Sequence, residues 1–281
     1  MRTIERPPVA AGSHVAHYSR LVWRITRMNG RTRLRFRADL LLSVLYAVLF
    51  QLSALTFAIV VLQRFTSLGG WTAPEVMLAA SLRVLSHSVH LFLFKNLARV
   101  PEMVRTGEFD VYLHRPVPPL LQLLLKEFHV TVFGDLAFAV TLFVVASQQL
   151  ALDWTVPMVL FLVAAVLGAA LLEGAIQLVM ASMAFRTEAS DILMTWTDNL
   201  ITAFANYPVT IFPWAVRLSF MTFFPIAFIA FFPASVILGR AGEAPVSPVM
   251  AYAAPAIDLA LFALACLWWT HSVRSYQSKG A

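Results

Sequence analysis

The 281-residue sequence predicts an all-α protein that crosses a membrane several times. Hydrophobic residues make up 59% of the chain and charged residues only 13%, whereas ordinary globular proteins carry about 25% charged residues. The mean hydropathy is +0.75. Apolar stretches of about 20 residues, the length that spans a bilayer as a helix, recur along the chain. This composition excludes nucleic-acid-binding modules, disulfide-rich secreted domains and cytosolic Rossmann-type enzymes.

Residues 1–38 form a basic arm ahead of the first apolar stretch. Arg20, Arg24, Arg27 and Arg31 recur at helical spacing, which predicts an amphipathic helix on the membrane surface, its guanidinium groups facing anionic lipid headgroups. The alternative is an unstructured arm whose charges only set the topology. The arm lacks the continuous apolar core of a signal peptide.

Residues 39–281 are predicted to form one domain with six transmembrane helices. The predicted spans are 40–62, 76–94, 131–152, 156–185, 192–212 and 251–270. The span 192–212 is the weakest, because Asp198, Asn199, Asn206 and Pro208 interrupt it. Before the last span, the apolar segment 214–238 is broken by two prolines, which predicts a pair of short re-entrant helices.

The distribution of basic residues orients these spans. Lysine and arginine concentrate in the arm, in segment 95–128 and in the tail, whereas the opposite connections carry only Arg64, Arg217 and Arg240. Because cytoplasmic loops carry the excess of Lys and Arg, both termini are expected to be cytoplasmic.

No motif for catalysis or energy coupling is present in the sequence. A P-loop contains a Gly-Lys pair, and none occurs here; if ATP drives the protein, another chain binds it. A G-x-S-x-G nucleophile elbow is also absent. The single cysteine, Cys266, allows neither an internal disulfide nor a cysteine-based zinc site.

Polar residues inside two predicted spans form the candidate intramembrane site. Arg83, His87 and His90 follow one another at i, i+4 and i+7 and so share a helix face, and Glu173 lies deep in span 156–185. Ionisable groups in a span face the bundle interior or a wet cavity. One interpretation is structural, with Glu173 as a buried partner of Arg83 or as a neutral acid that forms hydrogen bonds.

The other interpretation of these residues is a lining of the translocation pathway, which Asp198 and Asn199 of the next span would join. Such a site would also suit an ion-coupled secondary transporter or a membrane-embedded enzyme acting on lipid. A metal site at His87 and His90 is not predicted, because two ligands without a nearby cysteine or carboxylate cluster are a weak signal.

The segment 95–128 is the longest cytoplasmic connection. A short helix at Glu102–Arg105 is expected to stop at Gly107, and Pro116, Pro118 and Pro119 then stiffen the chain. A rigid, charged elbow suits force transfer to a soluble partner; the alternative is a plain connector.

The sequence in this segment resembles a known family. The runs RTGEFD (105–110) and LHRPVPPL (113–120) are similar to the cytoplasmic-loop signature of ABC-2-type exporter permeases, in particular the subfamily that pairs two different permeases with one ATPase. Further similarity lies at 206–212, 225–228, 232–235 and 273–278, so the resemblance covers nearly the whole chain in order.

The resemblance implies the fold of a type-2 ABC exporter permease. The arm would hold an interface helix, segment 95–128 the coupling helix, and 214–238 the re-entrant helices on the outer face. By position, seven residues would dock the ATPase: Glu102, Arg105, Gly107, Glu108, Asp110, Arg115 and Pro116.

The resemblance also implies a function and partners. Two copies of an ATPase would bind ATP and Mg, while this chain would bind no cofactor, metal or nucleic acid and have no enzymatic activity. A second permease chain, which the subfamily favours as a different one, would complete the pathway. The complex would export a hydrophobic or amphiphilic substrate (lipid, glycolipid, antibiotic or toxicant) across a prokaryotic plasma membrane.

Overall fold

The computed structural model describes residues 67–126, 132–187, 189–243 and 246–276, together with nine separate positions between residues 41 and 56. Throughout these residues the chain is helical or irregular, without a strand. The predicted arm, with Arg20, Arg24, Arg27 and Arg31, lies outside the described residues. Within the predicted span 40–62, the nine described positions are all helical: Leu41, Leu42, Leu45, Tyr46, Val48, Leu49, Leu52, Ser53 and Thr56.

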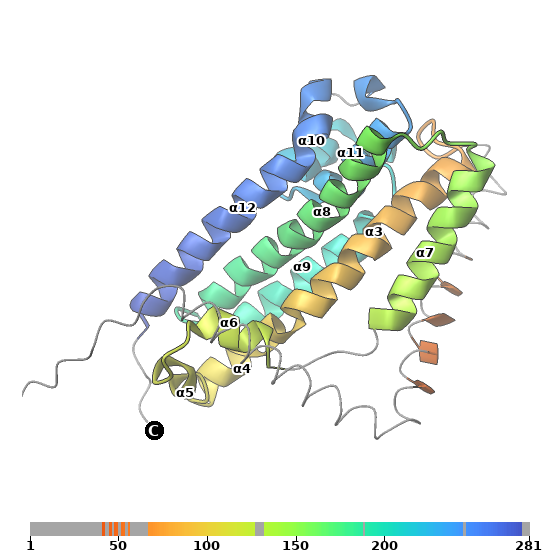
Figure 1. Cartoon of the computed structure of the whole chain (residues 1–281). Coiled ribbons are helices and arrows are strands. Elements are labelled where there is room, and N and C mark those ends of the chain that lie inside the picture. The colour runs from red at the N-terminus through yellow and green to blue at the C-terminus, as the bar shows by residue number, and fades with distance from the viewer. Residues whose placement is uncertain are drawn as a thin grey trace, which may run out of the picture.

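Four long helices run side by side and form the body of the molecule (Figure 1). They are α3 (Ala73–Phe94), α7 (Val132–Gln149), α8 (Val156–Met183) and α12 (Pro248–Arg274). α3 packs against both α7 and α8, and α8 packs against α12. Each of the four is long and apolar enough to cross a membrane, and together they match four of the predicted spans.

Local sequence explains where these helices begin. Thr72 precedes α3, and its backbone N–H and its hydroxyl both donate to Oε2 of Glu75, at 2.7 and 2.9 Å. Proline lies in the first turn of α3, α8 and α12, where its missing N–H costs no hydrogen bond and its fixed φ suits a helix.

The predicted span 192–212 is corrected by the structure. Its helix, α9 (Ser190–Phe204), ends eight residues earlier and has 15 residues, about 22 Å at the rise of an α-helix. Pro208 explains the early end, because a proline disfavours helical backbone at the residue before it. The chain continues as the short η2 (Val209–Ile211). Among the described helices that are long and apolar enough to cross a membrane, α9 is not included.

The segment 214–238 forms two bent pieces. α10 (Trp214–Thr222) is followed by η3 (Ile226–Phe228) and α11 (Phe231–Ile237), and the two halves meet at 74° next to Pro225. Two short helices are therefore found as predicted. The bend is compatible with a re-entrant pair or with one broken span.

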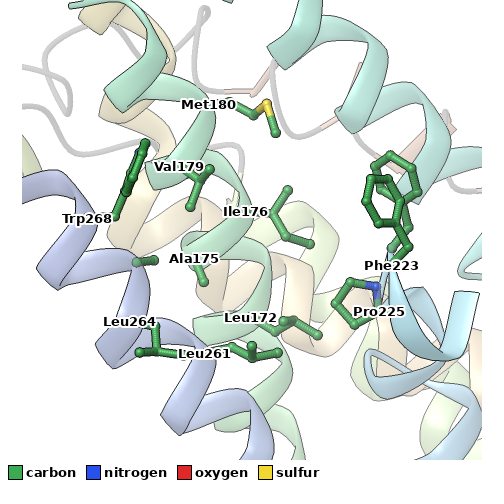
Figure 2. Close-up of a pocket in the computed structure, with 12 residues that line it drawn as sticks. Leu172, Ala175, Ile176, Val179, Met180, Phe223, Pro225, Leu261, Leu264 and Trp268 are labelled. Atoms are coloured by element: carbon green, nitrogen blue, oxygen red, sulfur yellow. The ribbon is translucent and has the colours of Figure 1, made fainter. Parts of the chain in front are cut away.

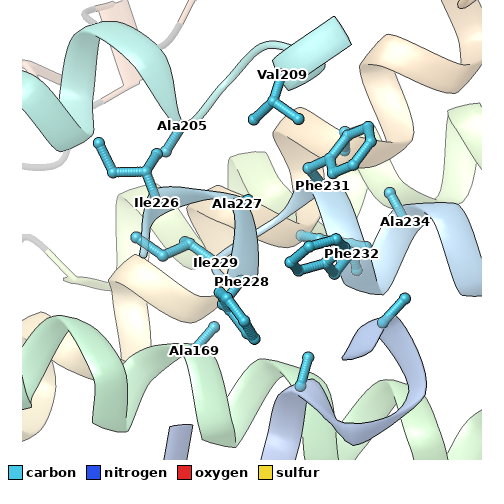
Figure 3. Packing of buried hydrophobic residues seen from close by; sticks show 14 of the residues in the cluster. Ala169, Ala205, Val209, Ile226, Ala227, Phe228, Ile229, Phe231, Phe232 and Ala234 are labelled. Carbon is cyan, nitrogen blue, oxygen red and sulfur yellow. The ribbon is translucent and has the colours of Figure 1, made fainter. Parts of the chain in front are cut away.

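The core is densest where α11 meets α3, α8 and α12. Figure 3 shows Phe228, Phe231 and Phe232 packed with small side chains such as Ala169 and Ala234. Next to this cluster α8 and α12 approach each other closely. A Cβ placed on Gly168 would lie only 3.0 Å from Cα of Pro255.

The segment between α3 and α7 lies at the opposite end of the molecule from α10 and α11 (Figure 1). It contains η1 (Lys95–Arg99), α4 (Val100–Arg105), α5 (Asp110–Leu113) and α6 (Pro119–Leu124). The predicted short helix therefore exists, beginning at Val100 and ending at Arg105. The last short element, η4 (Ala241–Glu243), follows α11 at the other end.

Candidate functional site

The polar stripe of α3 meets a carboxylate of α8 between the long helices. Nδ1 of His87 lies 2.7 Å from Oε2 of Glu173, and the Glu173 side chain is only 3% exposed. This contact gives each side chain a polar partner. Such a partner is needed because an isolated polar or charged group between apolar helices is costly.

Arg83 contacts a different helix from the one expected. Its Nη2 donates to Oγ1 of Thr202 on α9 at 3.3 Å, and the side chain is buried. The interpretation that makes Glu173 the partner of Arg83 holds only as an electrostatic interaction, without a direct ion pair. His87, one helical turn further along α3, forms that contact instead.

His90 completes the stripe through aromatic contacts. Its ring stacks on His87 and on Phe94, each with ring centroids 5.8 Å apart. In the part of the chain that the structure describes, no group of three or more His, Cys, Asp or Glu side chains could hold a metal ion. The arrangement at His90 is one of packing.

The two polar residues predicted to join this site differ in their placement. Asp198 on α9 is close enough to interact electrostatically with Arg83, His87 and Glu173, and its side chain is exposed at the surface of the chain. Asn199 is also exposed. The structure thus brings Arg83, His87, Glu173 and Asp198 into one polar cluster that reaches from the interior to the surface beside α9.

A second buried carboxylate was not predicted as such. Asp258 lies ten residues into α12 and is fully buried. Neither of its oxygens has a hydrogen-bond partner among the described residues. A Cβ placed on Gly168 of α8 would lie 3.1 Å from Oδ2 of Asp258.

The predicted ATPase-docking residues lie at one end of the molecule, in the segment between α3 and α7. Six of the seven are exposed, and Asp110 is half-buried. Gly107 follows α4 with φ +74°, in the left-handed region that suits glycine. The backbone therefore turns sharply between Arg105 and Glu108.

An ion pair closes the segment on itself. Nζ of Lys126 donates to Oε1 of Glu108 at 2.9 Å, and this hydrogen bond holds the pKa of Glu108 below its ordinary value. The cations of Arg115 and Lys126 both lie over the ring of Tyr112, 5.5 and 5.6 Å from its centroid. The segment is a compact elbow rather than an open loop.

Phe109 anchors this elbow in the body of the protein. The residue lies between exposed Glu108 and half-buried Asp110, yet it is 0% exposed. The centroid of its ring lies 4.9 Å from that of Phe185, 5.7 Å from that of Tyr276 and 6.2 Å from that of Trp269. Sequence reasoning assigned no role to this residue, although a lone aromatic among charged residues was the available signal.

An apolar cavity of about 630 Å³ lies between α8, α12 and the turn that follows α10. Figure 2 shows the side chains around it, including Val179, Met180, Phe223 and Trp268. All twelve lining residues are apolar. Such a surface favours hydrocarbon over water.

Fold and site together define a multi-pass, all-helical membrane protein with a rigid charged elbow at one end and an apolar body. The model of the ABC-2 family transporter proteins matches residues 48–280, and the chain belongs to that family. It is therefore the membrane permease of an ABC transporter, a non-catalytic subunit that works with an ATPase partner. No curated protein and no solved structure matches the chain.

Proposed function

We propose that this permease belongs to an exporter that carries a hydrophobic or amphiphilic substrate, such as a lipid, glycolipid, antibiotic or toxicant, out of a prokaryotic cell. Two copies of a separate ATPase bind ATP and Mg, and a second, different permease chain completes the pathway. Both termini are cytoplasmic, and α10 and α11 form a re-entrant pair on the outer face.

The observation that carries this proposal is the elbow between α3 and α7. Its exposed charges offer a docking surface, which includes Glu102, Arg105, Glu108 and Arg115. Its buried ring at Phe109 contacts the ends of α8 and α12. A displacement by the ATPase would therefore move two long helices at once, because close-packed interiors transmit strain.

The transmembrane body suits an apolar cargo. The described cavity is lined almost entirely by apolar surface, and the polar cluster of α3, α8 and α9 is confined to a few side chains. In the proposed cycle, ATP binding closes the ATPase dimer, the elbows move, and the two permease halves alternate between inward-open and outward-open forms.

The His87–Glu173 pair keeps one alternative testable, which is transport coupled to an ion gradient. Family membership favours ATP coupling over this alternative and over a membrane-embedded enzyme. The two modes of coupling differ in what stops transport, since dissipation of the proton gradient stops only the ion-coupled one.

A tagged chain purified from native membranes in mild detergent tests the subunit plan. Recovery of a P-loop ATPase and a second six-span protein is the expected result, and two copies of the tagged chain without another permease would replace the hetero-pair with a homodimer. Recovery of the tagged chain alone in several detergents would contradict the proposal of an ATPase-driven exporter.

Charge reversal tests the docking surface directly. Glu102→Lys on α4 should reduce recovery of the ATPase at least several-fold, because a like-charge contact replaces an attractive one. Asp153→Lys is the matched control: it is equally exposed but lies between α7 and α8, at the other end of the molecule. Equal recovery with both variants would remove α4 from the proposed interface.

A further inference from the structure

The cavity between α8 and α12 has the size and the surface of a ligand site. Its volume of about 630 Å³ falls within the range of about 300–1,000 Å³ that is usual for small-molecule pockets. Leu172 and Leu261 lie next to each other where α8 meets α12, and Ile176 of α8 points toward Phe223 and Pro225 on the other side (Figure 2). The lining lacks the few polar groups that would orient a polar ligand, so the part of the ligand inside is hydrocarbon.

One end of this cavity carries positive charge. Trp268 lines the cavity, and Cζ of Arg186, just after α8, lies 5.1 Å from the centroid of its ring. Tryptophan is enriched at the headgroup level of a membrane, and arginine is enriched in cytoplasmic loops, so this end of the cavity suits an anionic headgroup.

The length of the cavity matches one lipid leaflet. From Leu172 to Met180, α8 rises by about 12 Å, and half of the hydrocarbon core of a bilayer is about 15 Å. We infer that the cavity binds one acyl chain of an anionic lipid, with the headgroup held at Arg186. The inference follows from the side chains of α8 and α12 that line the cavity. It holds whichever way the transporter moves its substrate.

Photo-labelling in the assembled complex tests the site. The complex of permease and ATPase is placed in phosphatidylcholine vesicles with a trace of phospholipid that carries a diazirine on one acyl chain. The headgroup of this probe is either phosphatidylglycerol or phosphatidylcholine. The labelled peptides should come from residues 172–180 and 261–268. The anionic probe should label about fivefold more, since one arginine near the surface contributes about 1 kcal/mol of attraction.

Two variants separate the chain-binding and headgroup-binding parts. Val179→Trp fills the cavity and should abolish the labelling, whereas Val163→Trp, on an exposed position of the same helix, should leave it unchanged. Arg186→Gln should remove the preference for the anionic probe while the labelled positions stay the same. Because Arg186 is exposed, this variant tests the inference even where Val179→Trp fails to assemble.

Three results would overturn the inference. Label spread evenly over all exposed helix faces would mean that the cavity is only part of the lipid boundary, and equal labelling by both probes would remove the role of Arg186. The absence of label from the assembled complex, with label in the isolated chain, would mean that a protein partner fills the cavity.

The same experiment distinguishes the two sources of such a lipid. A resident membrane lipid should remain labelled at the site during ATP hydrolysis, whereas a transported lipid should leave the site, and its label should fall when Mg and ATP are added. Both results support an anionic acyl-chain site, and they decide whether it belongs to the transport pathway.

Discussion

The rings of Phe109 and Phe185 pack together with their centroids 4.9 Å apart. This contact joins the elbow between α3 and α7 to the end of α8. Trp269 and Tyr276 extend the contact to α12 and to the residues that follow it. The elbow is therefore fixed to the bundle by an aromatic cluster, while its charges remain at the surface.

Replacement of this ring should weaken the whole end of the molecule. Phe109→Ala should lower the free energy of unfolding by about 3–5 kcal/mol, the usual cost of deleting a buried phenylalanine side chain. The midpoint of thermal unfolding of the purified permease measures the loss. Phe109→Leu keeps most of the apolar surface and should cost much less; equal midpoints for Phe109→Ala and the wild type would show that the cluster bears little of the stability.

Gly168 should be intolerant of any side chain. A Cβ there would lie 3.0 Å from Cα of Pro255 and 3.1 Å from Oδ2 of Asp258, so Gly168→Ala must push α8 and α12 apart. Overpacking of this kind costs about 1–3 kcal/mol, which thermal unfolding can detect. Gly242→Ala is the control, because a Cβ there meets nothing within 4 Å. Similar unfolding midpoints for the two variants would contradict the close approach of the helices.

Much of the helical layout could be predicted because it depends on local sequence. The length of the apolar runs identified α3, α7, α8 and α12, and a glycine followed by prolines located the end of α4 and the elbow. The spacing of Arg83, His87 and His90 placed them on one helix face. Exposed positions of the elbow were predicted from charge alone.

Most of what was missed concerns contacts between distant segments, which local patterns do not encode. The partner of Glu173 depends on how far α8 is shifted along α3, and no sequence pattern sets that register. The buried state of Asp258 depends on the close approach at Gly168, and the anchor at Phe109 depends on three rings from the C-terminal half of the chain. The early end of α9 was an error of local reading, since Pro208 was visible in the sequence.

The ion pair of Glu108 and Lys126 should make the elbow sensitive to acid. Because the hydrogen bond from Lys126 lowers the pKa of Glu108 below its ordinary value of 4.5, its contribution to stability is present above pH 4.5 and is lost as the pH falls through the lowered pKa. Half of the Glu108 side chain is exposed, so the contribution at neutral pH should stay below about 1 kcal/mol.

Thermal unfolding of Glu108→Gln and wild type across this pH range checks the expectation. The two midpoints should differ at pH 7 and converge at low pH. Glu102→Gln, an exposed carboxylate of the same segment, should change the midpoint little at either pH. A difference between Glu108→Gln and wild type that persists in acid would mean that the carboxylate acts through something other than its charge.

Loss of the Glu173 carboxylate should weaken the packing of α3 against α8. Glu173→Leu leaves Nδ1 of His87 without its hydrogen-bond partner and should cost about 1–3 kcal/mol, the usual cost of leaving a buried polar group unsatisfied. Glu173→Gln keeps an oxygen that can accept from Nδ1 and should cost less.

The double variant His87→Leu with Glu173→Leu distinguishes packing from function. Because replacing both partners of a buried pair by apolar side chains is often neutral or stabilising, the double variant should unfold at a higher temperature than Glu173→Leu. Recovered stability with normal ATP-driven transport would give the pair a structural role, and recovered stability with lost transport would place it in the pathway. A double variant no more stable than Glu173→Leu would show that the 2.7 Å contact is not what makes the single variant costly.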